Sequence, residues 1–330
     1  MSKRISWKKG MRLTDETLLA ADQFMAESVV QAIAVAARGR FGLFTPTRPF
    51  QLSLSVSRGN VEVEALSCLA VTSSGDIIDV QFDTKYSNSY ETLVPIPNNE
   101  EAREYILIIS ANPEDWKENV DGQLEPNYTF ALIEPNKAIG SHSIPIGRIV
   151  YDDGWHEDNV NFVPPALCLS AHSKYMELHD QFVSLMRSID DKTGKYLETG
   201  AHDAICIYWP VIQQILITAN TEQEIMTPQQ LLSCVQRVIA AFTCACDLDE
   251  VLSLEDAETF RNFTRAPFNY RVAYLRIKQG LGMCFAINEK IDKFSLLKIE
   301  EAKPEPKPEP IPEPEPPKPD PRRFWEGKQI

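Results

Sequence analysis

The chain has 330 residues, enough for two domains of ordinary size, and 43% of them are hydrophobic, which is ample material for a core in each. Its 47 acidic and 33 basic side chains give a net charge of -14, and no basic patch offsets that charge. Such a surface repels phosphate backbones and anionic lipids, so we expect no nucleic-acid partner and no direct membrane insertion.

The N-terminus and the cysteines indicate where the protein works. Asp15, Glu16 and Asp22 interrupt the apolar stretch that an export signal would need. The longest uninterrupted apolar run, residues 205–212, is far shorter than the roughly 20 residues that span a bilayer. The seven cysteines are scattered among apolar neighbours, as reduced core cysteines are. We therefore expect a cytoplasmic protein without a transmembrane helix.

The first half of the chain predicts one helix followed by an antiparallel β-sandwich. Between Thr14 and Ala37, Thr14 or Asp15 can cap the helix and Gly39 can end it. Six apolar or small residues recur there at helical spacing: Leu18, Ala21, Met25, Val29, Ala32 and Ala36. The pattern then becomes alternation at 52–56, 61–65, 78–82 and 106–108, with turn-forming residues at 58–60, 73–76 and 97–99. Short strands at this spacing are typical of a sandwich.

Beyond the Pro164–Pro165 pair, which marks a junction, the sequence predicts a bundle of four helices. They cover residues 171–189, 205–219, 227–245 with a capping box at Thr227, and the stretch after Pro267. Apolar residues in each helix alternate steps of 4 and 3, the spacing of a coiled-coil seam. We expect copies of the chain to associate through these seams. The predicted contacts are Tyr175, Leu178, Phe182, Leu185, Leu231, Val235, Val238 and Phe242.

The C-terminal region is predicted to form no packed domain. Residues 300–321 are rich in Pro and Glu and too poor in apolar groups to offset the entropy of ordering, so we expect a disordered, extended linker. It ends in the peptide 322–330, which contains Arg322, Arg323, Phe324 and Trp325. These residue types dominate binding hot spots, which favours a tethered peptide ligand for another protein. The alternative is a terminus whose Trp325 folds back on its own domain.

No motif in the sequence predicts catalysis, a cofactor or a metal site. Nucleophile elbows, zinc-protease motifs and phosphate-binding glycine loops are absent from the sequence. His172 and His179 share a helical face beside seam residues, and the close pair Cys244 and Cys246 has no second pair or nearby histidine. We expect structural roles for all four. If the chain were an enzyme, its best candidates would be His142, His156 and the carboxylate turn Asp152–Asp153, which we otherwise expect to be a solvated hairpin turn.

Five stretches, taken in order, resemble TssK, a baseplate subunit of bacterial type VI secretion systems. They are Trp7–Leu13 (WKKGMRL), Asp22–Phe24, Phe41–Leu43, Ser143–Ile149 (SIPIGRI) and the junction Phe162–Ala171 (FVPPALCLSA). The matches cover roughly residues 5 to 295, and the Phe-x-Pro-Pro junction is the most specific of them. Leu18–Ala21 departs from the family's glutamine-rich pattern, and the Pro/Glu tail stands where TssK proteins usually carry a head domain.

The resemblance implies an α+β fold with these parts: residues 1–165 a helix and β-sandwich shoulder, 166–299 a helical neck, 300–321 the linker and 322–330 the terminal peptide. It also implies a non-enzymatic homotrimer, short of the usual head, that clamps the wedge proteins TssF and TssG. Trp7, Met11 and Leu13 would contact the wedge or anchor the terminus on the sandwich. The C-terminal peptide would grip an unidentified membrane-complex or adaptor protein. The alternative is a siphophage-like receptor-binding protein or tail-fibre adaptor.

Overall fold

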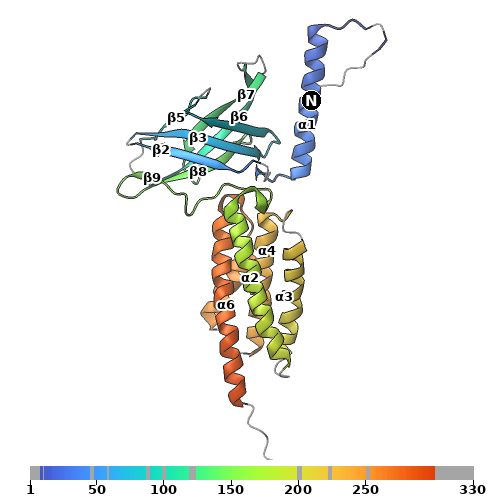
Figure 1. Ribbon diagram of the computed structural model, residues 1–330, viewed down its shortest axis with the longest axis vertical. Helices are drawn as coiled ribbons and strands as arrows, with labels where there is room; N and C mark the ends of the chain where they lie inside the picture. Colours follow the sequence, from blue (N-terminus) through green and yellow to red (C-terminus); the bar gives the residue numbers. More distant parts are fainter. Residues whose placement is uncertain are drawn as a thin grey trace, which may run out of the picture.

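The computed structural model shows an N-terminal helix, a β-sandwich and a helical bundle arranged along one long axis (Figure 1). It describes residues 8–9, 11–44, 48–57, 59–86, 90–98, 102–118, 124–198, 203–221, 225–249 and 253–301. Trp7 and the C-terminal residues 302–330, with the predicted linker and terminal peptide, lie outside the described residues. The mixed α and β class and the order of the parts are as predicted.

Helix α1, Asp15–Ala37, has the boundaries that the sequence predicts. The Thr14 hydroxyl accepts the backbone N–H of Thr17 at 3.3 Å, and the Thr17 hydroxyl accepts that of Thr14 at 3.0 Å. This reciprocal pair satisfies two amide donors that a helix start otherwise leaves free. At the other end Arg38 takes the left-handed conformation (φ 52°), and its N–H bonds to the Ala34 carbonyl at 3.1 Å. Gly39 (φ 74°) continues the turn into the sandwich.

The sandwich consists of two antiparallel sheets. One contains β1 (Gly42–Leu43), β2 (Gln51–Val56), β3 (Asn60–Val71), β4 (Ile77–Asp83) and β5 (Leu93–Pro95), all paired with the long strand β3. The other has the order β7-β6-β8-β9, formed by β6 (Glu104–Glu118), β7 (Leu124–Ile133), β8 (Ser143–Tyr151) and β9 (Trp155–Glu157). Val63, Val80, Leu107 and Ile144 are fully or almost fully buried between the sheets. The predicted antiparallel sandwich is confirmed.

The neck has five helices in the described part of the chain, not the four that we predicted. The four long ones are α2 (Ser173–Glu198), α3 (Asp203–Thr221), α4 (Pro228–Asp249) and α6 (Ala273–Glu301). The capping box of α4 is confirmed, because the Gln230 N–H bonds to the Thr227 hydroxyl at 3.1 Å and the Thr227 N–H to the Gln230 side chain at 2.7 Å. The additional helix, α5 (Leu254–Arg265), begins at a Ser253 cap and buries Phe260 and Phe263 in the bundle core.

The residues that we predicted to join copies of the chain lie inside the bundle of one chain. Each of the eight is 4% exposed or less: Tyr175, Leu178, Phe182, Leu185, Leu231, Val235, Val238 and Phe242. Tyr175 meets Tyr274 edge-on, at 5.9 Å between ring centroids. Helices packed antiparallel within one bundle bury the same 4-and-3 stripes as helices from separate chains. Our assignment of these residues to a contact between copies is therefore corrected, and such a contact must use other faces.

The sandwich and the neck are joined by backbone pairing as well as by a shared core. The Leu43 N–H bonds to the Pro165 carbonyl at 2.8 Å, and the Leu167 N–H bonds back to the Leu43 carbonyl at 2.6 Å. On the other side of the junction, Arg271, in the short 3-10 turn just before α6, donates to the carbonyl of Lys137 at 2.9 Å. One continuous cluster of buried side chains runs through Ala166 from sandwich to bundle. We therefore expect the two parts to move as one body.

His172 lies at this junction, between the sandwich and α2. Its ring lies 5.8 Å from that of Phe50, and its Nδ1 accepts the backbone N–H of Lys174 at 3.2 Å. Burial, and then the charge of Lys174, lower the pKa of His172 from 6.5 to about 4. The imidazole is thus neutral at pH 7 and serves as a packed junction residue, in line with the structural role that we expected.

The buried neutral His172 should make the protein less stable in mild acid. The unfolded chain takes up a proton near pH 6.5 and the folded chain only near pH 4, so stability is full above pH 6.5 and falls between those values. The loss should be on the order of 2–3 kcal/mol at pH 4. Urea unfolding of the wild type and of His172→Gln at pH 7 and pH 4.5 measures it. Equal pH dependence in both proteins would contradict this role.

Candidate assembly surface

Among the helices α1 to α6 in the described ranges, α1 buries the fewest of its residues. Of its 23 residues, Ala37 is the one that is buried, and Figure 1 shows the helix standing beside the sandwich. Leu18, Met25 and Val29 are 48%, 65% and 52% exposed. Most helices in proteins are stabilised by packing an apolar face, and exposed apolar patches commonly mark interaction sites. This helix therefore presents the strongest candidate for a functional surface.

Six apolar residues of α1 lie along one side of the helix, and we call this row the α1 stripe: Leu18, Ala21, Met25, Val29, Ala32 and Ala36. All but the half-buried Ala21 are exposed, and the exposed Leu19 and Val35 lie outside the row. The steps of 3 and 4 between stripe residues place them on that side of the helix. Within the described residues, α1 is also the one helix long and apolar enough to cross a membrane, a finding that our sequence analysis did not foresee. Buried core helices of soluble proteins pass the same test, but the apolar window of α1 is 0% buried. Asp22 and Glu27 lie within α1.

The base of α1 is held by a close backbone approach. A Cβ atom on Gly75, in the turn between β3 and β4, would lie 2.5 Å from the Val30 carbonyl oxygen and 3.0 Å from the Ala34 side chain. Gly75 also has φ 95°, which favours glycine. Val30 and Ala34 lie on the side of α1 roughly opposite the stripe. The helix is thus anchored by one side and leaves the other free.

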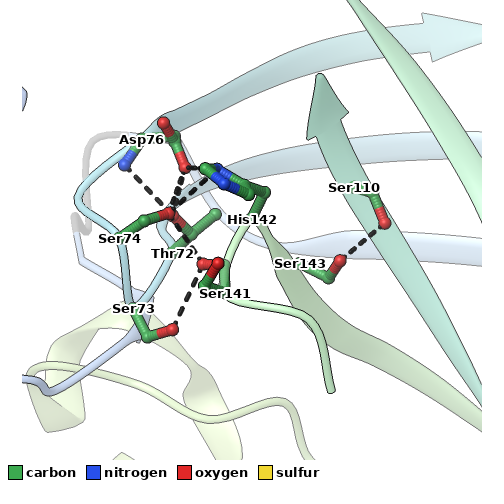
Figure 2. A network of polar contacts seen from close by, with 8 residues as sticks. All are labelled: Thr72, Ser73, Ser74, Asp76, Ser110, Ser141, His142 and Ser143. Carbon is green, nitrogen blue, oxygen red and sulfur yellow. Dashed lines mark hydrogen bonds and ion pairs between the residues drawn. The ribbon is translucent and has the colours of Figure 1, made fainter. Parts of the chain in front are cut away.

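The turn between β3 and β4, which contacts α1 at Gly75, is tied to the opposite sheet by a polar network. We call this network the clasp, and it is formed by Thr72, Ser74, Asp76, Ser141 and His142 (Figure 2). The Ser74 hydroxyl and backbone N–H both donate to the Ser141 carbonyl, at 2.8 and 3.1 Å. His142 Nδ1 lies 2.7 Å from a carboxylate oxygen of Asp76. Since β3 and β4 belong to one sheet and Ser141 and His142 precede β8 in the other, the clasp fixes the sheets to each other directly below α1.

Asp76 remains ionised in the clasp. Burial raises its pKa, but hydrogen bonds from Ser74, Thr72 and His142, together with the charge of His142, outweigh burial and hold the pKa of Asp76 below its ordinary value. The carboxylate therefore contributes stability above pH 4, and that contribution is lost as the pH falls through the lowered pKa. A persistent negative charge here keeps the turn fastened at physiological pH.

The clasp contains Ser, His and Asp but not the arrangement of a catalytic triad. The Ser74 hydroxyl and the Asp76 carboxylate both lie near Nδ1 of His142, at 3.1 and 2.7 Å. A nucleophile and its orienting carboxylate must contact different ring nitrogens. His156, the other histidine of the enzyme hypothesis, lies in β9 near the far end of β8, roughly 25 Å away at 3.3 Å per residue. The residues proposed for an enzyme therefore do not converge.

The Asp152–Asp153 turn and His179 have structural surroundings, whereas the Cys244–Cys246 pair is described only at Cys244. Asp152–Asp153 form the hairpin turn between β8 and β9, as expected, with Asp153 at φ 57°. His179 is buried, and its Nε2 lies 3.1 Å from the Ala219 carbonyl, linking α2 to α3. Burial raises the pKa of the Cys68 thiol to about 12, while Cys244 is exposed. Within the described ranges no cluster of three or more His, Cys, Asp or Glu residues could hold a metal ion.

Two of the three predicted wedge contacts, Met11 and Leu13, lie just before the free end of α1. Met11 and Leu13 are 38% and 62% exposed, so neither is buried on the sandwich as an intramolecular anchor would be. They precede the Thr14 cap and continue the apolar surface of α1 toward its N-terminal end. Nothing in the sequence pattern indicated that the whole of α1 would share their exposure.

A second uncharged surface lies on the neck. Helix α3 carries no charged residue between Ala204 and Thr221, and its exposed side chains include Pro210, Gln214 and Ile217. Ile217 is 62% exposed. In Figure 1, α1 and α3 lie on the same side of the long axis, whereas α6 lies on the other. One side of the molecule thus presents two uncharged surfaces along its length.

Neither protein-family models nor curated protein sequences match this chain. Solved structures do. A chain of the type VI secretion system TssK-TssF-TssG baseplate subcomplex is 12% identical with a TM-score of 0.57, over 88% of this chain and 99% of that one. TssK of the EAEC system, bound to a nanobody, is 14% identical with a TM-score of 0.56, over 82% and 99%. A crystal structure of TssK is 10% identical with a TM-score of 0.57, over 87% and 69%. The resemblance to TssK is confirmed at the level of the fold.

Proposed function

From this shared fold, we propose that the chain is a structural subunit of a type VI secretion baseplate. The observation that carries the proposal is the extent of the match, 88% of this chain and 99% of a chain in the TssK-TssF-TssG subcomplex. The correspondence includes both sandwich and neck, so it concerns the arrangement of the parts as well as each part. The protein would act as a homotrimer that holds wedge proteins of the TssF and TssG type at the cytoplasmic side of the inner membrane.

The described structure supports a mechanical role. Force applied to the sandwich reaches the neck through the paired backbone at Leu43 and Pro165 and through the Arg271 contact. The clasp holds the two sheets in register below α1. Packed cores resist deformation because their contacts have few alternative arrangements. A clamp needs this rigidity, and the wedge would be gripped by the exposed end of α1 at Met11 and Leu13.

Co-purification with the wedge tests this function. The full chain, co-expressed with the TssF and TssG homologues of its own cell, should purify with them. Leu13→Asp should reduce wedge capture at least tenfold, because a charge would replace an apolar contact. Gln31→Asp, which adds the same charge at an exposed position on another side of α1, should leave capture intact. The proposal would be contradicted if both variants captured the wedge as well as the wild type, or if the wild type did not capture it.

Deleting residues 300–330 tests, in the same assay, whether binding to the wedge and binding to the membrane-side partner use different parts of the chain. We propose that the terminal peptide with Arg322, Arg323, Phe324 and Trp325 binds a membrane-complex or adaptor protein. The truncated chain should therefore keep its oligomeric state and the wedge while losing that partner. A truncated chain that keeps every partner would remove the peptide from the proposal.

A further inference from the structure

We propose that the α1 stripe is the contact between copies of this chain, with α1 helices of neighbouring protomers packing against one another in parallel. The inference rests on the proposed function, which requires a trimer but does not say where its copies meet. The eight neck residues that sequence spacing favoured are buried within one chain. The stripe has the same periodicity and is exposed, with Met25 at 65%.

The distribution of charge favours a second copy of the chain as the partner of the α1 stripe. At a net charge of -14, copies of the chain repel each other, so they approach most easily through surfaces that carry no charge. The six stripe residues are all uncharged. Glu16 and Glu27 lie on other sides of α1, whereas Asp15 and Asp22 border the stripe near its N-terminal half. Like-to-like contact centred on the part of the stripe from Met25 to Ala36 therefore buries apolar surface away from Glu16 and Glu27.

The stripe is also presented rigidly. Gly75 contacts Val30 and Ala34 on the side of α1 away from Met25 and Val29, and the clasp immobilises the turn that carries Gly75. A surface held in one orientation loses little conformational entropy on association. Repeated contacts in a symmetric oligomer need this fixed geometry, because the same surface must meet its copy at the same angle.

The uncharged surface of α3 extends the same side of the molecule. Copies arranged around an axis parallel to the long axis, on the side of α1 and α3 in Figure 1, would bring like elements together along the length of the protein. Ile217 and Gln214 of α3 would then meet uncharged surface. The charged outer residues of α2, such as Lys174 and Glu177, and those of α6, such as Lys278, would remain in solvent.

Light scattering on the full chain tests the stripe. The wild type should elute as a trimer of the 37.3 kDa chain. Met25→Asp should raise the concentration at which it dissociates by at least roughly a hundredfold, because apposed charges would be buried without partners. Gln31→Asp, exposed on another side of α1, should remain trimeric. Circular dichroism equal to the wild type in both variants shows that α1 and the fold persist.

Each other outcome overturns the inference in a distinguishable way. A trimeric Met25→Asp would leave the assembly standing and remove the stripe from it. A monomeric wild type would contradict the trimer itself and the proposed function with it. If Met25→Asp stays trimeric but no longer captures the wedge, the stripe is a wedge surface instead. If the wild type floats with phosphatidylglycerol vesicles and Met25→Asp does not, the stripe is a lipid surface instead.

Crosslinking provides a second readout that does not depend on destabilising the helix. In a Cys244→Ser background, Val29→Cys should form disulfide-linked dimers under mild oxidation, since stripe positions of neighbouring copies would face each other within reach of a disulfide. Gln31→Cys should crosslink at least tenfold less. Equal crosslinking at the two positions would overturn the stripe as the contact.

Discussion

Replacing Phe182 by alanine should lower the free energy of unfolding by about 3–5 kcal/mol, the range for truncating a fully buried phenylalanine. Phe182 is 0% exposed at the centre of the four long neck helices. Its removal leaves a cavity that the surrounding helices can fill only in part. Phe285→Ala on α6 is the matched control, since Phe285 is 48% exposed and should change stability by less than about 0.5 kcal/mol. Urea unfolding at one fixed protein concentration measures both.

This pair of variants decides between the two roles that the helical spacing allowed. A residue of the bundle core destabilises each chain when truncated, whereas a residue between copies mainly shifts the oligomeric equilibrium with protein concentration. Phe182→Ala should therefore lose stability equally at low and high concentration. A loss seen only near the dissociation concentration would contradict the position of Phe182 inside one chain. For the same reason, Leu178→Asp with Phe182→Asp should unfold the neck, not merely separate copies.

The elements predicted well from the sequence are those with strong local signals. Thr14 and Thr227 fix the starts of two helices through their caps, and alternation located β2, β3, β4 and the start of β6. Helix α5 was missed, although Ser253 and the acidic residues after it mark a start, because its apolar residues are few. Strands β1, β5 and β9 are two or three residues long, too short for a period to emerge.

The candidate surface was only half visible in the sequence. The helical periodicity of Leu18, Met25 and Val29 is clear in the sequence. However, an apolar stripe that packs within its own chain has the same periodicity as one that packs against a partner. For this reason Phe182 and its neighbours were wrongly predicted to join copies of the chain. The clasp could not be foreseen at all, since Asp76 and His142 are 66 positions apart and join only when the two sheets pack. Polar pairs between residues far apart in the chain produce no periodic pattern in the sequence.

Gly42→Ala should destabilise the protein by about 3 kcal/mol or more, because two costs coincide at the junction of sandwich and neck. Gly42 has φ 125°, which residues with a side chain rarely adopt, and an added Cβ would lie 2.2 Å from the Pro165 carbonyl oxygen. That carbonyl accepts the Leu43 N–H, so relieving the collision would break the pairing that joins the two parts.

Gly39→Ala is the control for backbone strain alone. Gly39 has φ 74° but no atom within 4 Å of an added Cβ, so alanine there should cost only about 1–2 kcal/mol. Thermal unfolding compares the two variants, and amide exchange at Leu43 and Leu167 reports the junction directly. Exchange should quicken in Gly42→Ala and stay unchanged in Gly39→Ala. If both variants lose equal stability with equal exchange, the Pro165 contact does not hold the junction, and the rigid connection on which the clamp depends must come from the Arg271 side instead.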